Sequence, residues 1–407
     1  MTNNITKHQN IPILRFPGFS DPWTEKKLGT LSDVRDGTHD SPKYHNKGYP
    51  LITSRNLKTD GSIDFDNVNL IALEDFMKIN KRSKVDIGDI LFGMIGTIGN
   101  PVLIRHDNFA IKNVALIKEK QDLINKYLFQ YLKSSYIDKK FYQKNAGGTQ
   151  KFIALGLIRD LGIPTPSLPE QQKIADFLSS IDSWLDNLRA QKSFLESYKK
   201  SIMQKIFSQK IRFKDENGKD YPEWEEKKID QLGDVIGGGT PDTSMSSNWN
   251  GDIDWFTPTE IKDKYIYDSK RKITKTGLKT SSARILPPGS LLLTSRATIG
   301  YVSISRKEST TNQGFQSIVV NSYNSNEFLY YWITANRNML LRKANGSTFL
   351  EISGKDVRKT IVNTPCLPEQ HRIADFLTSI DKSIDFKQKQ IAEAELWKKG
   401  LMQRMLV

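Results

Sequence analysis

One stretch of about forty residues occurs twice in this chain, and it constrains the fold more than any other feature. The sequence reads PSLPEQQKIADFLSSID at 166–182 and PCLPEQHRIADFLTSID at 365–381, an offset of 199 residues. The same offset still holds where KKSIMQK at 199–205 answers KKGLMQR at 398–404. A register shared over this length marks an internal repeat. The chain is therefore predicted to consist of two tandem half-units.

Each copy predicts one long helix. Pro169 is tolerated in a first helical turn, and Ser167 with Glu170 has the spacing of a capping box. Apolar residues then recur at steps of three and four: Ile174, Leu178, Ile181, Leu185, Leu188, Leu195, Ile202 and Ile206, and in the second copy Ile373, Leu377, Ile380, Ile384, Ile391, Trp397, Leu401 and Met405. Such a narrow seam is typical of helices packed on each other. We expect two helices, over 169–209 and 368–407, of roughly 60 Å each.

The segment before the first domain indicates how the halves are connected. Leu14-Arg15-Phe16, followed by Trp23, resembles Ile211-Arg212-Phe213, followed by Trp224, and the second of these motifs comes directly after the first long helix. By symmetry, the N-terminal motif should lie beside the end of the second helix, around Val407. This predicts a circular arrangement in which the two helices are antiparallel.

Between the repeated anchors the half-units differ, and each reads as mixed α/β. Short apolar or β-branched runs predict strands at 50–54, 90–93 and 114–117, and at 253–257, 291–294 and 316–320. Aromatic-rich helices are expected at 126–136 and 327–341. The predicted fold class is α/β (α+β), with two globular domains joined by two long antiparallel helices as a pseudo-two-fold tandem repeat. The expected divisions are 1–165, 166–210, 211–364 and 365–407.

Charge and composition favour a nucleic-acid partner. The chain has 60 Lys and Arg against 46 Asp and Glu, for a net charge of +14, which suits a polyanion such as double-stranded DNA. No apolar run reaches the 18 or so residues of a membrane span, and the first ten residues lack the apolar core of a signal peptide. The single cysteine, Cys366, cannot form an internal disulfide. We expect a cytoplasmic protein without membrane contact.

Signatures of catalysis are missing from the sequence. It contains no Walker A loop, no H-E-x-x-H, no C-x-x-C, and no Asn/Asp-Pro-Pro-Tyr/Phe run of the kind that an amino-methyltransferase uses. Its five histidines form no metal-ligand spacing. We therefore expect no catalytic residue, no metal site and no cofactor bound by this chain.

What remains is a set of loop residues of the types that recognise DNA. Arg and Lys hold phosphates and read guanine, and Asn and Gln read adenine in the major groove. For any one of them the alternative is a loop residue that satisfies local backbone groups. The DNA-binding candidates are Thr38, His39, Ser54, Arg55, Asn56, Lys58, Lys112, Asn113, Gln150 and Lys151 in the first half, and Thr240, Thr259, Lys262, Ser295, Arg296, Asn312, Gln313, Ser347 and Thr348 in the second.

The chain resembles the DNA-specificity subunits of bacterial type I restriction–modification systems. The resemblance rests on the twin L-P-E-Q motifs at 168 and 367, the G-G-T-Q-K run at 147, the I-R-F-K-D run at 211 with Y-P-E-W at 221, G-T-P at 239 and T-N-Q-G-F at 311. It covers nearly the whole chain and its order of parts. One departure is N-G-S-T-F at 345, which only loosely repeats the run at 147.

The resemblance implies a non-catalytic subunit in which two target-recognition domains each read half of a split, asymmetric DNA site. The long helices would space these domains and dock two adenine-N6 methyltransferase subunits, which use S-adenosylmethionine. Restriction/translocase subunits, which use ATP and Mg, would join that core as the ATP-dependent type I endonuclease.

Polar positions in the long helices repeat as faithfully as apolar ones, which packing between the helices alone would not explain. We therefore expect them to bind partner subunits, with helix capping for Glu170 and solvation for the rest as the alternative. These residues are Glu170, Gln171, Asp176, Lys199, Glu369, Gln370, Asp375 and Lys398. Two other functions stay open: a coiled-coil scaffold that does not read DNA, and a stand-alone DNA-modifying enzyme.

Overall fold

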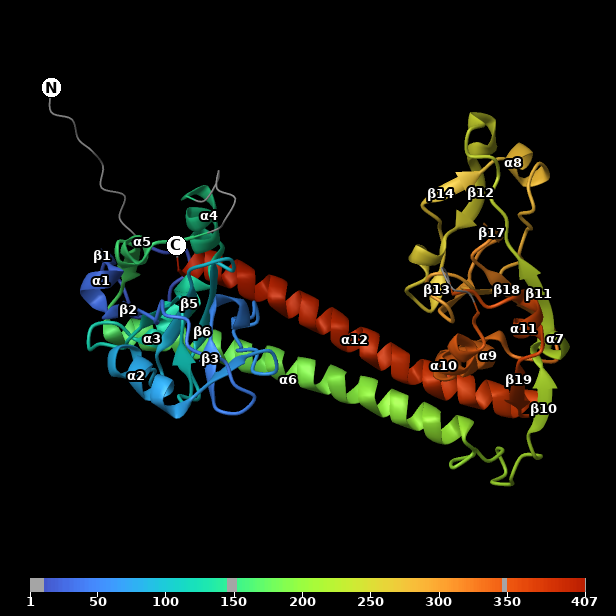
Figure 1. Cartoon of the computed structure of the whole chain (residues 1–407), viewed down its shortest axis with the longest axis horizontal. Coiled ribbons are helices and arrows are strands. Elements are labelled where there is room, and N and C mark those ends of the chain that lie inside the picture. The colour runs from blue at the N-terminus through green and yellow to red at the C-terminus, as the bar shows by residue number, and fades with distance from the viewer. Residues whose placement is uncertain (1–10, 145–151, 346–349, 407) are drawn as a thin grey trace. The chain divides into compact units, whose positions relative to one another are not determined.

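The computed structural model describes residues 11–144, 152–345 and 350–406 (Figure 1). Its contacts divide the chain into two compact units. The first unit consists of Met1–Arg189 with Lys389–Val407, and the second unit is Ala190–Gln388. Each long helix is thus divided between the two units, whereas each globular domain lies within one of them.

The first unit is built on a four-stranded antiparallel sheet. Its order is β2 (Val34–Asp36), β8 (Val114–Ile117), β5 (Ile90–Gly93) and β6 (Gly99–Leu103). A second, mixed sheet has the order β4 (Asn69–Ile71), β3 (Tyr49–Ile52) and β7 (Ala110–Ile111), and β1 (Thr24–Lys27) pairs with β9 (Gly162–Thr165). Every residue of β5 and β8 is buried, which agrees with their continuous apolar sequences. The three strands predicted here are confirmed.

Short helices cover these sheets, and one of them differs from its prediction. They are α1 (Leu28–Leu31), η1 (Ser54–Asn56), α2 (Leu73–Ser83), α3 (Asn125–Leu132), α4 (Ser135–Lys144) and α5 (Leu155–Arg159). The single helix expected at 126–136 is wrong, because the chain turns between α3 and α4. Here the Ser134 N–H donates to the Tyr131 carbonyl, and the Ser134 carbonyl accepts from Ile137 to begin the next helix.

The second unit repeats this plan and adds one strand. Its five-stranded sheet has the order β11 (Gly233–Gly237), β18 (Gln316–Val320), β15 (Leu291–Leu293), β16 (Val302–Ser305) and β13 (Tyr265–Ile266). The other sheets are β14 (Arg271–Ile273), β12 (Trp249–Phe256) and β17 (Ser309–Thr311), and the ribbon of β10 (Glu225–Lys228) with β19 (Ile361–Thr364). The predicted strands are confirmed, and β13 has no counterpart among the described strands of the first unit.

Helices of the second unit follow the same order. They are α7 (Ile229–Leu232), η2 (Ser246–Asn248), η3 (Pro258–Glu260), α8 (Lys275–Lys279), α9 (Asn326–Ala335), α10 (Arg337–Arg342) and α11 (Gly354–Arg358). The helix expected at 327–341 is interrupted at Asn336, whose N–H and side-chain amide both donate to the Trp332 carbonyl. Helix α9 therefore ends at Ala335, and α10 begins at Arg337.

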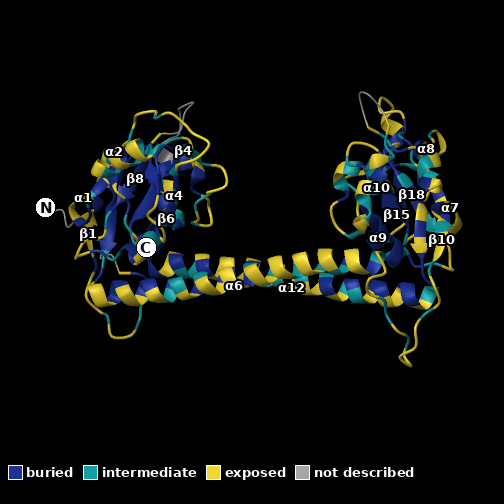
Figure 2. Ribbon diagram, turned by 60° about the horizontal axis from the view of Figure 1, so that its bottom comes forward, coloured by how far each residue is buried: buried dark blue, intermediate teal, exposed yellow. Residues whose placement is uncertain are grey.

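The two long helices are α6 (Leu168–Phe207) and α12 (Leu367–Met405), each beginning one residue before its predicted start. In the first unit, Leu185 and Leu188 of α6 share a core with Ile391 of α12. In the second unit, Ile206 of α6 shares a core with Ile373 of α12. The early part of each helix therefore packs on the late part of the other, and the predicted antiparallel pairing is confirmed (Figures 1 and 2).

The predicted circular connection is also confirmed. The Leu14 N–H donates to the carbonyl of Arg404, near the end of α12, at 2.8 Å. In the second unit the Ile211 N–H donates to the carbonyl of Lys205, near the end of α6, at 3.2 Å. The chain thus enters each domain from the end of a long helix, once through a covalent link and once through a hydrogen bond.

One residue of the predicted seam is misplaced. Trp397 is 50% exposed, and the buried positions beside it are Ala394 and Lys398. The lysine is buried because its ammonium pairs with Asp182 of α6 at 2.5 Å. An ion pair therefore occupies a seam position that an apolar pattern assigns to the neighbouring tryptophan.

Candidate nucleic-acid interface

In the first unit, two predicted loop segments meet beside the end of the four-stranded sheet. Thr38 forms a parallel bridge with Lys112, whose ammonium donates to Ser41 Oγ at 2.6 Å. The ring of His39 lies between two side chains, with Nδ1 2.8 Å from Asn113 Oδ1 and Nε2 2.8 Å from Asp36 Oδ2. The loop after β2 and the turn between β7 and β8 thus present one polar surface.

The second unit joins the corresponding loops in the same way. Thr240 Oγ1 donates to Gln313 Oε1, which links the loop after β11 to the turn between β17 and β18. Asn312 is half-buried and closes that turn by accepting from the Gly314 N–H at 2.8 Å. The exposed side-chain amide of Gln313 is therefore held in place by its hydrogen bond from Thr240.

A glycine permits this close approach in each unit. A Cβ added at Gly37 would lie 2.5 Å from the Ile111 carbonyl oxygen, and one at Gly238 would lie 2.0 Å from the Asn312 carbonyl oxygen. Real Cβ atoms do not come this close to backbone, so these positions require glycine. The two loops can therefore bring their polar side chains together at the same point of both units.

Two other candidates support the loops from within. Ser54 is buried, and its hydroxyl donates to the Asn113 carbonyl at 3.0 Å and accepts from the Met94 N–H at 3.0 Å. Asn56 is also buried, and its side chain accepts from Thr53 N–H at 2.9 Å and donates to the Asn67 carbonyl at 3.0 Å. These contacts define the shape of the loops, which is the alternative role considered for each candidate.

The remaining candidates in the second unit lie at the corresponding strand ends. Thr259 is exposed and shares a hydrogen bond with Thr257 at 3.1 Å. Ser295 is buried; its N–H donates to the Gly314 carbonyl at 2.7 Å, which ties the loop after β15 to the turn that carries Gln313. Thr259 therefore offers a hydroxyl to solvent, and Ser295 serves the loop through its backbone.

Four cationic candidates are exposed. Arg55 and Lys262 have no ion-pair partner among the described residues. Lys58 lies 3.7 Å from Asp64, and Arg296 lies 2.8 Å from Glu351. Exposed cations of this kind are suited to phosphate contacts, because neutralising a phosphate releases the counterions that DNA condenses around itself. Gln150, Lys151, Ser347 and Thr348 lie outside the described residues.

Comparison with known proteins decides the family. A family model described as "Type I restriction modification DNA specificity domain" matches residues 20–196 and again 221–396. The chain belongs to the family of type I restriction–modification DNA specificity subunits. As such it is non-catalytic, and it recognises the DNA target within a restriction–modification complex.

Individual relatives agree with this assignment. The type I restriction enzyme MjaIX specificity subunit of Methanocaldococcus jannaschii is 42% identical over 178 residues, which span 42% of this chain and 41% of that relative. A crystal structure of the S subunit from M. genitalium has a TM-score of 0.59 at 16% identity, covering 97% of this chain and 99% of the other. A structure titled for complex assembly of the type I R-M system has a TM-score of 0.61 at 18% identity, covering 95% and 98%. These structures share the fold.

Within this specificity subunit, two of the predicted partner-binding residues form the centre of a repeated clamp. Glu170 is buried and accepts from Arg15 Nε at 2.7 Å and from Trp23 Nε1 at 3.1 Å. Glu369 is likewise buried and accepts from Arg212 Nη2 at 3.0 Å and Trp224 Nε1 at 3.0 Å. Each glutamate fastens the segment that enters a domain to the start of a long helix. The hydrogen bonds to these carboxylates raise the pKa of both arginines.

The neighbouring glutamines form a second repeated contact. Gln171 accepts from the Ile124 N–H at 3.0 Å and donates to the Pro166 carbonyl at 3.0 Å. Gln370 accepts from the Ser325 N–H at 2.8 Å and donates to the Pro365 carbonyl at 2.9 Å. Both side chains are buried, and they hold the helix that covers each sheet against the start of α6 or α12.

The two lysines of this set join the long helices. Lys398 pairs with Asp182 at 2.5 Å in the first unit, and Lys199 pairs with Asp381 at 2.5 Å in the second. Burial lowers the pKa of Lys398, and the carboxylate of Asp182 acts against that shift. Asp176 and Asp375 differ from the other six residues because they are exposed, with Gln172 donating to Asp176 at 2.8 Å. These two therefore offer their charge to solvent.

Sequence reasoning missed a half-buried lysine in the second unit. Lys264 lies 2.5 Å from Glu327, donates to Tyr331 at 2.9 Å and donates to Thr378 of α12 at 2.8 Å. Burial lowers the pKa of Lys264, with Glu327 opposing the shift, while burial and a hydrogen bond to Glu327 raise the pKa of Tyr265 to about 12. A lone lysine in a variable segment gives no sequence signal for such a role.

The described residues contain neither a metal-binding cluster nor a membrane-spanning helix. No three His, Cys, Asp or Glu side chains there are grouped so that they could hold a metal ion. The described helices include none with the length and hydropathy that a membrane span requires. The expected absence of a cofactor bound by this chain stays a prediction.

Proposed function

We propose that this subunit reads a split, asymmetric DNA site, with each globular domain recognising one half. The observation that carries the proposal is the repeated pairing of polar loops, through His39 with Asn113 and Thr240 with Gln313, in corresponding loops of two otherwise different domains. Arg, Asn and Gln side chains on such loops read base edges, while neighbouring Lys and Arg hold phosphates. Different residues at corresponding points favour two different half-sites.

The exposed candidates are proposed to contact the DNA directly, and the buried candidates are proposed to act by determining the shape of the loops. The recognition domains are proposed to be 1–165 and 211–364, with 166–210 and 365–407 as the helical spacer between the half-sites. The bases and the length of the gap follow from loop geometry and DNA shape, and residue type alone does not determine them.

Exchanging residues 20–150 for the corresponding domain of a relative is expected to change one half of the target and leave the other half intact. Each mismatched base pair costs about 1–3 kcal/mol, so affinity for the parental site should fall at least about tenfold. Methylome sequencing of cells that express the complex measures both halves at once. A continuous or palindromic target, or a change in both halves after one exchange, would refute this division. A scaffold that does not read DNA would show no effect of the exchange.

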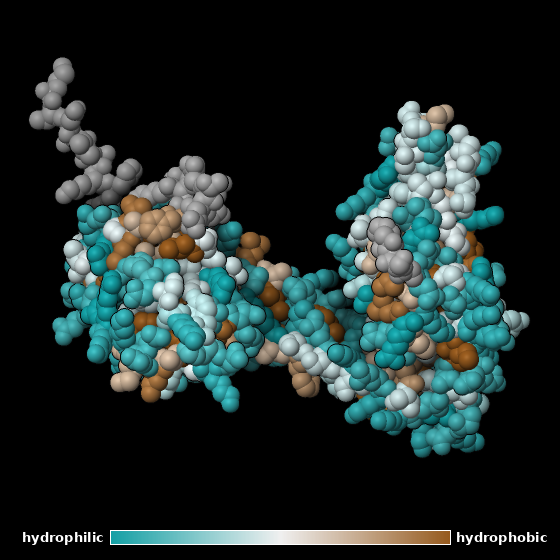
Figure 3. Space-filling model, in the orientation of Figure 1, coloured by the Kyte–Doolittle hydropathy of each residue, from teal (hydrophilic) through white to brown (hydrophobic). Residues whose placement is uncertain are grey.

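We further propose that the long helices dock two adenine-N6 methyltransferase subunits, which supply S-adenosylmethionine, and that restriction/translocase subunits supply ATP and Mg chemistry in the cytoplasm. Exposed apolar side chains on the long helices support a docking role, with Trp184, Leu396 and Trp397 in the first unit and Phe194 and Phe386 in the second. The rings of Trp184 and Trp397 lie 6.5 Å apart, and exposed aromatic residues that gather in this way mark interaction surfaces. Figure 3 shows apolar side chains reaching the surface along the helices.

Reversing the charge of Asp176 and Asp375 to Lys should weaken assembly with a methyltransferase subunit about tenfold, because rim charges contribute to encounter and register. Both carboxylates are exposed at equivalent positions, so the fold should tolerate the change. Size-exclusion chromatography and analytical ultracentrifugation measure the assembly. Glu216→Lys, an exposed loop residue with the same change of charge, is the control. Equal assembly of all variants would remove these carboxylates from the interface.

A further inference from the structure

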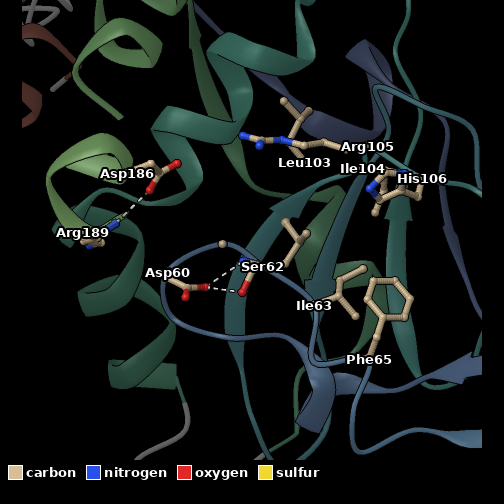
Figure 4. A pocket seen from close by; sticks show the side chains of 12 residues that line it. Asp60, Ser62, Ile63, Phe65, Leu103, Ile104, Arg105, His106, Asp186 and Arg189 are labelled. Atoms are coloured by element: carbon tan, nitrogen blue, oxygen red, sulfur yellow. Dashed lines mark hydrogen bonds and ion pairs between the residues drawn. The ribbon is translucent and has the colours of Figure 1, made fainter. Parts of the chain in front are cut away.

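The first unit has a cleft beside the edge of its four-stranded sheet. It has a volume of about 370 Å³ and lies between the hairpin of residues 57–65, the end of β6 and helix α6 (Figure 4). Leu103 lines it from the end of β6 and Arg105 from the segment that follows, and Asp186 and Arg189 line it from α6. An adjoining cavity of about 460 Å³ shares these residues and extends to Lys126 on α3.

In the second unit a strand of the chain itself occupies the corresponding position. There β13 pairs in parallel with β16, and the N–H groups of Ile304 and Arg306 donate to the carbonyls of Lys264 and Ile266 at 2.7 and 2.9 Å. In the globular domains the repeat has an offset of 201 residues, as between Trp23 and Trp224. The residues equivalent to Ile304 and Arg306 are therefore Leu103, the last residue of β6, and Arg105, two residues beyond it. In the described part of the first unit, β6 is the last strand of its sheet. Its outer edge is therefore available to another strand.

The hairpin of the first unit is closed on itself and leaves this edge free. The Lys58 N–H donates to the Ser62 carbonyl at 2.9 Å, and Leu57 bridges Ile63. The Asp60 carboxylate accepts from the Ser62 N–H at 2.8 Å and from its hydroxyl at 2.6 Å. Gly61 has φ of +89°, which suits the tight turn. Forming a strand like β13 from this segment would break all of these contacts.

One charge beside the cleft is reversed relative to the second unit. Lys264 pairs with Glu327 there, and the residue that replaces Glu327 in the first unit, at the offset of 201, is Lys126. Lys126 and Arg105 are exposed and have no ion-pair partner in the described ranges. Of the acids that line the two cavities, Asp182 pairs with Lys398 and Asp186 pairs with Arg189, whereas Asp60 accepts from Ser62 and has no ion-pair partner in the described ranges. Two cations, Lys126 and Arg105, therefore stand against one carboxylate without an ion-pair partner, and the excess charge is positive.

We propose that this cleft binds an extended, acidic peptide segment of a methyltransferase subunit, which pairs with the outer edge of β6 as β13 pairs with β16. An Asp or Glu of that segment would face Lys126 and Arg105, in place of the Lys264–Glu327 pair. The strand edge supplies backbone hydrogen bonds, and Ile63, Phe65 and Leu103 supply apolar contact, which together fit strand addition. This inference rests on the proposed assembly with methyltransferase subunits.

The test measures the affinity of the full-length chain for fluorescent 15-residue peptides that tile the methyltransferase subunit, by anisotropy. We expect an acidic peptide to bind, and Lys126→Glu to weaken it at least tenfold. Lys120→Glu, an exposed residue outside the cleft with the same change of charge, should bind as the parent does. Arg105→Pro should weaken binding more than Arg105→Ala, because only proline also removes the edge N–H.

Four outcomes would overturn the proposal. Peptides that bind Lys126→Glu as tightly as the parent, or no peptide binding while the intact methyltransferase subunit still binds, would exclude this cleft and leave the proposed assembly standing. Competition by a random-sequence duplex that is equally sensitive to Lys126→Glu would identify a phosphate site in place of a peptide site. If the intact methyltransferase subunit does not bind the parent chain, the proposed assembly fails and this inference fails with it.

Discussion

The Glu170→Ala variant is expected to lose about 3–5 kcal/mol of unfolding free energy, as is typical when one partner of a buried ion pair is removed. The carboxylate of Glu170 is buried, and its two oxygens accept from Arg15 at 2.7 and 2.8 Å and from Trp23 at 3.1 Å. Alanine would leave a guanidinium that is only 12% exposed and an indole N–H without their acceptor. It would also detach the entering segment from the start of α6.

The equivalent variant of the second unit allows the loss of unfolding free energy to be compared. Glu369→Ala should cost less, about 3 kcal/mol, because Arg212 is 21% exposed and water can replace part of what it loses. Glu223 is the other ion-pair partner of Arg212, and its side chain is 90% exposed. Glu223→Ala should therefore cost under about 1 kcal/mol of unfolding free energy. Denaturant unfolding followed by circular dichroism measures all three. If Glu170→Ala and Glu223→Ala unfold alike, the clamp does not stabilise the domain entry.

This clamp shows where sequence reasoning stopped. Its glutamate, arginine and tryptophan were each recognised as repeated residues, at offsets of 199, 197 and 201. Their meeting in space depends on the circular connection, which brings a segment from the end of one helix to the start of the other. Once that connection is accepted, three polar residues repeated at nearly one offset are a signal that they form one site. The faithful repetition of Glu170 and Glu369 is thus explained by contacts within the chain.

Regular elements were predictable because their signals are local. The seams of α6 and α12 and the buried runs of β5 and β15 depend on periodicity and on apolar content. The error at Trp397 arose where a tertiary ion pair overrides that pattern, since Lys398 is buried only because Asp182 faces it. The breaks after Leu132 and at Asn336 depend on turn hydrogen bonds that helix periodicity does not report.

The candidate interface was predictable in residue type and only partly in role. The pairing of Thr240 with Gln313 could not be read from residues 73 positions apart, although both are DNA-binding candidates by residue type. Ser54 and Asn56 have the chemistry of DNA contacts, yet their side chains are buried in local bonds. Burial and loop closure distinguish the exposed candidates from the buried ones, and residue type does not determine either property.

The Leu185→Asp variant is expected to destabilise the first unit by at least about 4 kcal/mol, which combines the loss of a buried leucine with the burial of a charge. Leu185 is 3% exposed and lies in the core that joins α6 to the end of α12. The new carboxylate would also lie three residues after Asp182, and like charges at this spacing repel each other. For a unit of this size the melting temperature should fall by roughly 8–16 °C.

Two matched variants separate the seam from the helix surface. Ile384→Asp, at the equivalent position of α12, should cost less than Leu185→Asp because Ile384 is only partly buried in its core. Phe386→Asp changes an apolar residue of α12 that is 59% exposed, so it should cost under about 1 kcal/mol. Differential scanning calorimetry measures the order. The antiparallel seam requires Leu185→Asp to be the most damaging of the three, because only there does the charge enter a fully buried contact between α6 and α12. Equal melting of Leu185→Asp and Phe386→Asp would contradict that packing.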